Sequence, residues 1–384
     1  MNIKQTDSRY VAHTYKRFDV AIVKGDGCLC YDDNGKEYID MTSGIGVNAF
    51  GYADPVWAQA VADQAKTLQH TSNLYYTAPC AELAEILCTR TGMSRVFFSN
   101  SGAEANECAV KVARKYAAEH KGAEYYNIIT LNKSFHGRTL TTLAATGQDS
   151  FHHTFLPLTD GFLYAEPNDI DGLKKLVNEN KIAGILIETV QGEGGVNALD
   201  ADFVKAVDMI CKENDIVFMV DEVQTGNGRT GKLYSYMHFG VQPDVVSTAK
   251  GLAAGLPMGA TLMSEKVADV LSYGDHGSTF GGNPVCAAAA VSVMNRMDEA
   301  FLAEVTEKGK YIKERIEAAC YPVSGLGLMI GIKTKKPVSE VLAACIEKGV
   351  LCLSAKEKLR LLPPLNIPMD LLEEAVDKII EALG

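Results

Sequence analysis

The chain has 384 residues, of which 47% are hydrophobic and 22% are charged, and its formal net charge is −11 at pH 7. This length is too great for one small core and suits a large domain with a smaller one, in a protein of ordinary globular composition. The acidic balance argues against a nucleic-acid partner, because phosphate binding requires clusters of basic residues and the sequence shows none.

Residues 20–40 predict a small antiparallel unit, because a polar turn at 32–35 separates two short strand-like runs. From about residue 54 helical and strand-like patterns alternate. Helices are predicted at 55–69, 80–91, 102–120, 202–213 and 284–297, and strands at 95–99, 125–131, 183–189, 216–220 and 244–248. This alternation predicts an α/β fold with a mostly parallel central sheet and helices on both faces.

After about residue 300 the order becomes helix (301–319), strand (328–333), helix (337–348), short strands and a last amphipathic helix. We expect the two ends of the chain to fold together. The predicted division is an N-terminal segment (1–50) that belongs to the small α+β domain, a large domain (51–290) and a C-terminal small domain (291–384).

The sequence has no apolar signal region at its start and no run long enough to span a membrane. Its ten cysteines are scattered, and only Cys28 and Cys30 are closely spaced, which makes a poor metal site. Reduced, buried thiols fit this pattern better. We therefore expect a cytoplasmic protein without a bound metal or a membrane contact.

Two predicted strands end in residues that can act on one ligand. The apolar run 216–220 ends in Asp221, and the run 244–249 ends in Lys250. In open α/β sheets, ligands bind outside the carboxyl ends of the strands, so this carboxylate and this amine can converge. Pyridoxal phosphate (PLP) needs such a pair, since its aldehyde takes a Schiff-base amine and its pyridinium nitrogen takes a carboxylate.

A tight turn between a strand and a helix provides a candidate anion site. Ser101 can cap the helix, Gly102 lets the backbone approach a ligand, and the first-turn N–H groups are free to bind a phosphate. An ordinary capped helix is the alternative interpretation. The spacing is not that of the Gly-x-x-x-x-Gly-Lys loop, which disfavours a nucleotide-binding module.

Other candidates follow strand ends or lie in polar loops. Phe135 can stack on a flat ring and Arg138 can grip a carboxylate, although alone they fit a core residue and a surface ion pair better. His136 taken alone carries less weight than either. Glu188, near the end of the strand 183–189, is a candidate site residue. Glu193, in the glycine-rich loop behind it, is interpreted as structural or solvated.

Two late segments add polar groups. The loop 277–284 contains Ser278 and Thr279, which can donate to a phosphate, although the loop can also be a plain helix entry with Pro284 at its first position. Arg360 is an isolated charge in an apolar stretch, so it needs a buried carboxylate partner from the protein or the substrate.

Together these motifs resemble those of the class III (subgroup II) PLP-dependent aminotransferases, most closely the acetylornithine aminotransferases. The resemblance covers nearly the whole chain, and the matching segments 100–107, 135–139, 221–226, 249–251 and 277–284 occur in the family's order. It implies the fold-type I, aspartate aminotransferase-like fold. One departure is 51–55, where the family has Gly-His-x-His-Pro; we expect a local effect on packing.

The resemblance also implies a role for each matching residue. Lys250 would carry the Schiff base with PLP and move the proton, and Asp221 would keep the ring nitrogen protonated. The remaining cofactor contacts would be Ser101, Gly102 and Ala103 on the phosphate, Phe135 and Val223 on the two ring faces, Gln224 on the ring hydroxyl, and Thr279 on the phosphate in the other subunit. The last contact implies a homodimer with shared active sites.

The substrate-binding residues implied in the same way are Arg138, Glu188, Arg360 and Ser278. Arg138 would hold a substrate carboxylate. Glu188 and Arg360 would pair while the acylated amine donor is bound and separate when glutamate arrives.

The implied activity is ping-pong transfer of the terminal amino group of N2-acetyl-L-ornithine to 2-oxoglutarate, in arginine biosynthesis. Small and aliphatic residues at 43–48, where free-ornithine enzymes carry a tyrosine, favour an N-acylated substrate. Succinylornithine, succinyldiaminopimelate, ornithine and 4-aminobutyrate stay alternative substrates. An aminomutase would need no amino acceptor, and a non-catalytic PLP-binding relative would have lost Lys250, Asp221 or Arg138.

Overall fold

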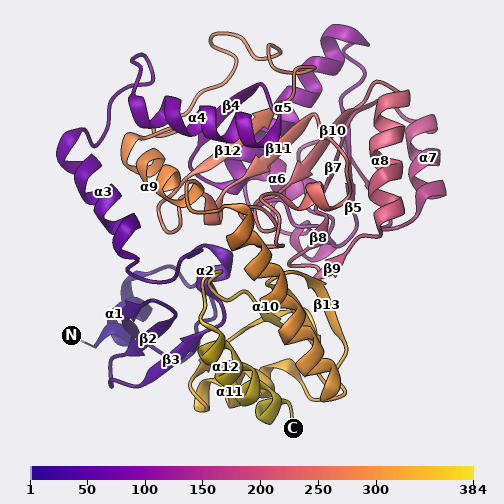
Figure 1. The fold of residues 1–384 in the computed structure, drawn as a ribbon. Helices are drawn as coiled ribbons and strands as arrows, with labels where there is room; N and C mark the ends of the chain where they lie inside the picture. Colours follow the sequence, from indigo (N-terminus) through magenta and orange to yellow (C-terminus); the bar gives the residue numbers. More distant parts are fainter. Residues whose placement is uncertain (1) are drawn as a thin grey trace.

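The computed structural model describes residues 2–384. Figure 1 shows an upper part built around a central sheet and a lower part that contains both ends of the chain. The helix α10 (Glu299–Ala318) runs from the centre of the molecule down into the lower part.

Seven strands form the central sheet, in the order β4-β12-β11-β10-β7-β5-β6. β12 pairs antiparallel with β4 and β11, and all other neighbours in the sheet pair parallel. This arrangement confirms the mostly parallel α/β sheet. The strands are β4 (Arg95–Ser99), β5 (Asn127–Leu131), β6 (Phe162–Ala165), β7 (Ile182–Ile187), β10 (Val217–Asp221), β11 (Val245–Thr248) and β12 (Gly259–Met263).

Helices cover both faces of this sheet, and β10 shows how its residues divide between them. Val217 and Met219 pack in the cluster that contains the buried face of α5, whereas Phe218 and Val220 belong to the main core on the other face. Alternate strand residues point to opposite faces, so a strand buried on both sides is apolar throughout. The helices of the upper part are α3 (Pro55–Thr67), α4 (Ala78–Thr91), α5 (Gly102–His120), α6 (Leu140–Ala145), α7 (Ile170–Glu179), α8 (Ala201–Glu213) and α9 (Pro284–Met294).

The lower part contains two four-stranded sheets. The predicted antiparallel unit at 20–40 is confirmed as β1 (Ile22–Asp26), β2 (Leu29–Asp32) and β3 (Glu37–Asp40). β15 (Val350–Leu351) pairs parallel with β3, so both ends of the chain contribute to one sheet. This pairing supports the division into 1–50, 51–290 and 291–384, which we retain as a proposal.

The second sheet of the lower part has the order β13-β14-β17-β16. Its strands are β13 (Val323–Leu326), β14 (Met329–Lys333), β16 (Leu353–Ala355) and β17 (Lys358–Leu361), and α11 (Val338–Glu347) and α12 (Met369–Leu383) complete the region. Across residues 2–384, no helix combines the length and apolar character that a membrane span requires.

Short elements connect these parts. They are α1 (Ile3–Tyr10), α2 (Ser43–Gly46), β8 (Val190–Gln191), β9 (Asn197–Ala198) and the 3₁₀ turns η1 (Asp149–Phe151), η2 (Ser235–His238) and η3 (Lys250–Leu252). Neither β6 nor β12 had a predicted counterpart, because each is a short run without a clear alternation of apolar and polar residues.

The segment 51–55, which departs from the family pattern, makes local contacts. The backbone of Tyr52 bridges Gly27, and its ring covers Gly25, where an added Cβ would come within 2.4 Å of the ring. Asp54 caps α3 by accepting from the N–H of Trp57 at 2.8 Å and pairs with Arg296 at 2.9 Å. These residues join α3 to the end of α9.

Candidate active site

The carboxyl ends of β4, β5, β7, β10 and β11 lie at the same edge of the central sheet, since β4 is parallel to β11 through the antiparallel strand between them. Residues after these strand ends line a cavity of about 470 Å³. It is lined by the predicted site residues Ser101, Gly102, Ala103, Phe135, Arg138, Glu188, Asp221, Val223, Gln224 and Lys250. Three predicted residues, Ser278, Thr279 and Arg360, lie outside this lining.

Asp221 is buried at the end of β10 and is held by three donors. Its Oδ2 accepts from Asn106 Nδ2 at 2.7 Å and from His136 Nδ1 at 2.8 Å, and its Oδ1 accepts from the N–H of Val223 at 3.0 Å. The bond from His136 requires the proton on Nδ1, since a carboxylate only accepts. A carboxylate fixed in this way, away from water, is suited to stabilise a positive charge in the cavity.

Asn106 and His136 are site residues that sequence reasoning missed. Asn106 is buried on α5, donates to the carbonyl of His136 at 2.8 Å and accepts from Ser247 Oγ at 2.5 Å. Its position four residues after Gly102 puts both on one face of the helix, which is a pattern that the sequence does contain. The contact of His136 with Asp221 is made between distant segments and has no local pattern.

Lys250 opens the turn η3 with a φ of +48°, a left-handed conformation that is uncommon outside glycine. Burial lowers the pKa of its amine to about 8, against the opposing attraction of Glu193 and Asp221. Asn227 supports the backbone before it, donating from Nδ2 to the carbonyl of Ala249 and to Thr248 Oγ1, both at 2.9 Å. The amine therefore gives up its proton at a lower pH than an exposed lysine does.

The turn before α5 forms a cradle for an anion. Ser101 Oγ accepts from the N–H of Glu104 at 3.2 Å, and Glu104 Oε2 accepts from the N–H of Asn100 at 3.0 Å. The N–H groups of Gly102 and Ala103 have no acceptor within the helix, as in any first turn. A Cβ on Gly102 would lie 2.5 Å from Val223 Cγ1, so only glycine permits this close approach.

Arg138 lies at the mouth of the cavity with its guanidinium available. Its Cζ is 4.2 Å from the ring centroid of Phe151 and 5.5 Å from that of Phe135. The side chain is exposed, and no carboxylate in the described part of the chain pairs with it within 4.0 Å. The guanidinium is thus free to bind a ligand carboxylate in a bidentate manner.

The predicted pairing of Glu188 with Arg360 is not found in this structure, in which Arg360 pairs with Glu193 instead. Arg360 Nη1 lies 2.5 Å from Glu193 Oε1 and 3.3 Å from Gln224 Oε1. The loop between β8 and β9 brings Glu193 over β17, whereas Glu188 stays at the end of β7. Sequence reasoning favoured the strand end and gave the loop too little weight.

Glu188 is buried and binds main-chain groups. It accepts from the N–H of Phe135 at 2.9 Å and from that of Gly192 at 3.4 Å. Burial, with a smaller contribution from Asp221, raises the pKa of Glu188 well above its ordinary value, while these two N–H groups oppose the shift. Glu188 therefore ties the Phe135 loop to the loop that carries Glu193.

Ser278 and Thr279 belong to a separate surface cavity of about 740 Å³, which they share with His70 and Asn73. Ser278 Oγ accepts from Asn100 Nδ2 at 3.0 Å, which is its link to the main cavity. Thr279 thus lies on the outside of the chain, away from Lys250.

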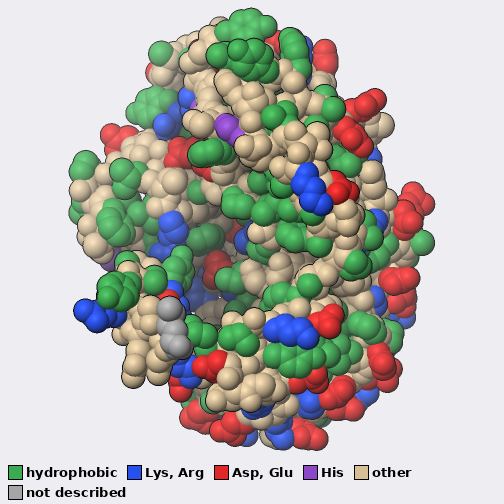
Figure 2. Space-filling model, turned by 90° about the vertical axis from the view of Figure 1, so that its left-hand side faces the viewer, with side chains coloured by type: hydrophobic (Ala, Val, Ile, Leu, Met, Phe, Trp, Pro, Cys, Tyr) green, Lys and Arg blue, Asp and Glu red, His purple; other side chains and the backbone are tan. Residues whose placement is uncertain are grey.

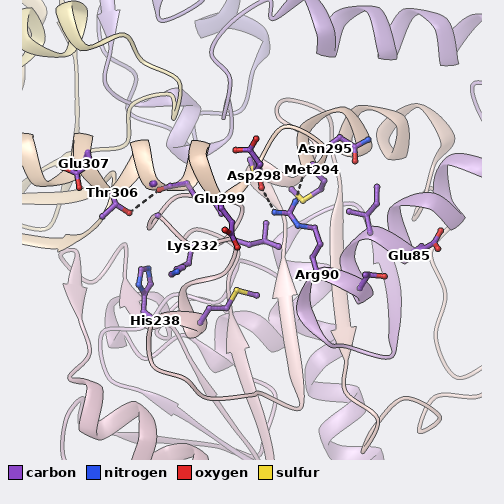
Figure 3. Close-up of a pocket in the computed structure, with 18 residues that line it drawn as sticks. Glu85, Arg90, Lys232, His238, Met294, Asn295, Asp298, Glu299, Thr306 and Glu307 are labelled. Atoms are coloured by element: carbon purple, nitrogen blue, oxygen red, sulfur yellow. Dashed lines mark hydrogen bonds between the residues drawn. The ribbon is translucent and has the colours of Figure 1, made fainter.

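A larger cavity of about 1300 Å³ lies between α4, α10 and the segment 231–238. Figure 3 shows Arg90 in its wall with hydrogen bonds to main-chain groups, and the donation to the carbonyl of Met294 spans 2.7 Å. None of the predicted site residues line it. We therefore assign the chemistry to the smaller cavity around Lys250.

Comparison with known proteins agrees with this geometry. The family model for aminotransferase class-III matches residues 10–383. The chain belongs to the class-III aminotransferases. This aminotransferase is 50% identical to an acetylornithine aminotransferase of Haemophilus ducreyi, over 100% of the chain and 98% of the relative.

Solved structures show the same fold. An N-acetylornithine aminotransferase from Stenotrophomonas maltophilia K279a is 32% identical with a TM-score of 0.85, covering 98% of this chain and 97% of that one. An ornithine aminotransferase from Toxoplasma gondii is 30% identical with a TM-score of 0.95, covering 99% and 93%, and PLP partly occupies its active site. The fold-type I architecture predicted for this aminotransferase is confirmed.

The cavity of this aminotransferase fits PLP, the cofactor of such enzymes. A fixed carboxylate at Asp221 suits a ring nitrogen, and the amide cradle at Gly102 suits a phosphate. The buried amine of Lys250 suits the aldehyde, because burial lowers its pKa to about 8.

Proposed function

We propose that this aminotransferase moves the terminal amino group of N2-acetyl-L-ornithine to 2-oxoglutarate, giving N-acetyl-L-glutamate 5-semialdehyde and L-glutamate in arginine biosynthesis. The observation that carries the proposal is the 50% identity over the full length to the acetylornithine aminotransferase of Haemophilus ducreyi. The cavity adds support: within the segment 43–48, the residue in its lining is Val47, which leaves room for an acyl group.

The cofactor would be held by residues of several strand ends. The phosphate would lie on Ser101, Gly102 and Ala103, the ring between Phe135 and Val223, and the ring hydroxyl near Gln224. When bound, PLP supplies an electron sink for the carbon that loses its proton. Because one cofactor carries the amino group between two substrates, the reaction proceeds by a ping-pong mechanism.

Lys250 and Asp221 would do the central chemistry. The neutral amine of Lys250 is both a nucleophile and a base, and burial makes this form accessible near neutral pH by lowering its pKa to about 8. Asp221 would keep the ring nitrogen protonated, and its bonds from Asn106 and His136 hold the carboxylate in place. These two residues therefore act through Asp221.

Two arginines would distinguish the substrates. Arg138 would bind the carboxylate that every substrate brings to the cavity mouth. Arg360, paired with Glu193 at 2.5 Å, would be neutralised while acetylornithine is bound and would become available to the second carboxylate of glutamate. This assignment gives Glu193 the part that we first expected of Glu188.

A homodimer would complete each site. Thr279 lies on the outside of the chain beside an exposed apolar segment, in which Leu74, Tyr75 and Tyr76 are 87%, 70% and 106% exposed. Asn73 binds this segment to the Thr279 loop, donating from Nδ2 to the carbonyl of Ser278 at 2.8 Å. Figure 2 shows many hydrophobic side chains on the face that includes α3, around a central hollow. We propose that a second copy covers this surface and receives Thr279 at its cofactor.

We also place this aminotransferase in the cytoplasm. Its cysteines are free thiols in the structure, and most are wholly or partly buried, as suits a reducing compartment.

The test is the visible absorption of the purified protein with PLP, before and after each amine is added without a keto acid. Acetylornithine should abolish the band of the lysine-bound cofactor, and 2-oxoglutarate should restore it. Free ornithine should act only weakly. If the band disappears mainly with ornithine, succinylornithine or 4-aminobutyrate, the proposed mechanism stands but the assigned substrate changes to that amine. A protein that forms no such band would contradict the role of Lys250.

A further inference from the structure

Arg229 joins three distant segments by its guanidinium. It follows β10 in a loop and is only 2% exposed. Nη1 donates to the carbonyls of Leu328 at 3.2 Å and Pro363 at 2.5 Å, and Nη2 donates to Ser43 Oγ at 3.2 Å. Its own carbonyl accepts from the N–H of Leu328 at 3.0 Å. One side chain thus connects the upper part of the molecule to three points of the lower part.

Each of these points leads to Arg360, which contacts the cavity-lining Gln224, or to Val47, which lines the cavity itself. We call Arg360 and Val47 together the wall. Pro363 follows β17, the strand of Arg360. Leu328 precedes β14, in which Gly331 is the register partner of Arg360. A shift of either carbonyl would therefore move Arg360.

Ser43 leads to the same wall by another route, since it opens the turn that ends at Val47 in the cavity lining. The turn rests on the lysine segment: a Cβ on Gly251 would lie 3.5 Å from the carbonyl oxygen of Gly46. The position of Ser43 thus sets the distance of Val47 from Lys250.

The turn itself is strained. Ser43, Gly44, Ile45 and Gly46 have consecutive φ values of +42°, +65°, +67° and +75°. Ile45 is β-branched, so this conformation is costly and persists only where the surroundings hold it. The hydroxyl of Ser43 donates to the carbonyl of Leu362 at 2.6 Å while it accepts from Arg229. Arg229 is therefore one of the groups that maintain the turn.

The charge of Arg229 does not find an ion-pair partner. Within residues 2–384, no carboxylate lies within 4.0 Å of it. Burial lowers the pKa of Arg229 to about 9, and Asp40 opposes this effect only by its more distant charge. A buried, unpaired cation lowers the stability of the folded protein, and an apolar residue would fill the space with a smaller loss of stability. We attribute the presence of arginine here to the several N–H donors of its guanidinium and not to its charge.

We propose that Arg229 is a positioning residue that holds the wall bearing Arg360 and Val47 in register with Lys250. It thereby sets the affinity for a substrate with two carboxylates, which must reach Arg138 and Arg360 together. The choice of glutamate as that substrate rests on the function proposed above.

The test compares the two half-reactions of the holoenzyme in Arg229→Lys. Lysine keeps the charge but offers one nitrogen, so it cannot reach all three acceptors of the guanidinium. We expect the apparent KM for glutamate in single turnovers to rise about tenfold or more, as small misplacements do at reactive sites. The PLP absorption band and the affinity for PLP should change much less. The half-reaction with acetylornithine should lose less than that with glutamate, because acetylornithine depends on Val47 but not on Arg360.

Two further variants make the result decisive. Ser43→Ala removes one acceptor and should raise the KM for glutamate in the same direction but less. Arg90→Lys is the matched control, because Arg90 also donates to main-chain carbonyls but does so in the other cavity (Figure 3), and it should leave the KM unchanged.

Equal losses in PLP affinity and in both half-reactions of Arg229→Lys would show a merely structural role, and an unchanged KM for glutamate would also overturn the proposal. If the wild type reacts with glutamate but not with acetylornithine, and Arg229→Lys still raises the KM for glutamate, the proposed function fails while the role of Arg229 stands.

Discussion

Lys250 and Glu188 show what burial does to ionisable groups in this cavity. The pKa of Lys250 is lowered to about 8 and that of Glu188 is raised, and burial is the main cause of both shifts. Both shifts make the neutral form easier to reach than it is in an exposed side chain. Three donors hold the carboxylate of Asp221 in place beside them. A site of this kind is prepared for a cofactor that is positive at the ring nitrogen and negative at the phosphate.

The buried lysine should destabilise the protein when PLP is absent. Its pKa falls from 10.5 in the unfolded chain to about 8 in the folded one. The resulting loss in the free energy of unfolding is therefore fully present below pH 8. It amounts to up to about 3 kcal/mol on the scale of 1.4 kcal/mol per pKa unit. Between pH 8 and 10.5 the unfolded chain binds a proton that the folded chain lacks, so stability rises with pH.

Lys250→Met should therefore raise the thermal midpoint of the PLP-free protein at pH 7, and its advantage over the wild type should shrink at pH 9.5. Measuring both midpoints at both pH values checks this. Lys174→Met, at an exposed lysine, is the control and should show no such dependence. An advantage of equal size at the two pH values would contradict the assignment to a buried charge.

At the scale of elements, the sequence predicted what depends on local pattern. The strands that end in Asp221 and Lys250 were predicted because buried parallel strands are apolar throughout, and their shared sheet edge brought the cofactor residues together. The partner of Arg360 was not predictable in this way. Glu188 and Glu193 lie five residues apart, and only the course of the loop between β8 and β9 decides which one reaches β17. The bond from His136 to Asp221 likewise depends on tertiary packing.

The corrected pair leads to a prediction about substrate choice. Glu193→Gln removes the charge that neutralises buried Arg360, so Arg360 should attract a dicarboxylate more strongly. We expect a several-fold lower KM for glutamate and a higher KM for acetylornithine, measured in the separate half-reactions.

Glu188→Gln provides the comparison, because Glu188 binds the N–H of Phe135 and should affect both half-reactions alike. If Glu188→Gln shifted the preference toward glutamate and Glu193→Gln did not, the original pairing of Glu188 with Arg360 would be restored.

At the scale of the whole molecule, the location of Thr279 is the main reason to expect a second copy. Thr279 lines a cavity on the outside of the chain, whereas Ser101, Gly102 and Ala103 line the cavity around Lys250. The exposed aromatic segment beside it is held to the same loop by Asn73. A subunit that presents this loop to its partner would contribute to a site that is not its own.

Mixed dimers can test this arrangement. Lys250→Met should inactivate the site of its own chain, and Thr279→Asp should repel the phosphate in the site of its partner. In a mixed dimer one site then carries both changes and the other carries neither. Random reassociation gives mixed dimers in half of the molecules, each with one intact site of two, so about a quarter of wild-type activity should return from two inactive variants. If Thr279 served its own chain, each site of the mixed dimer would carry one change and no activity would return.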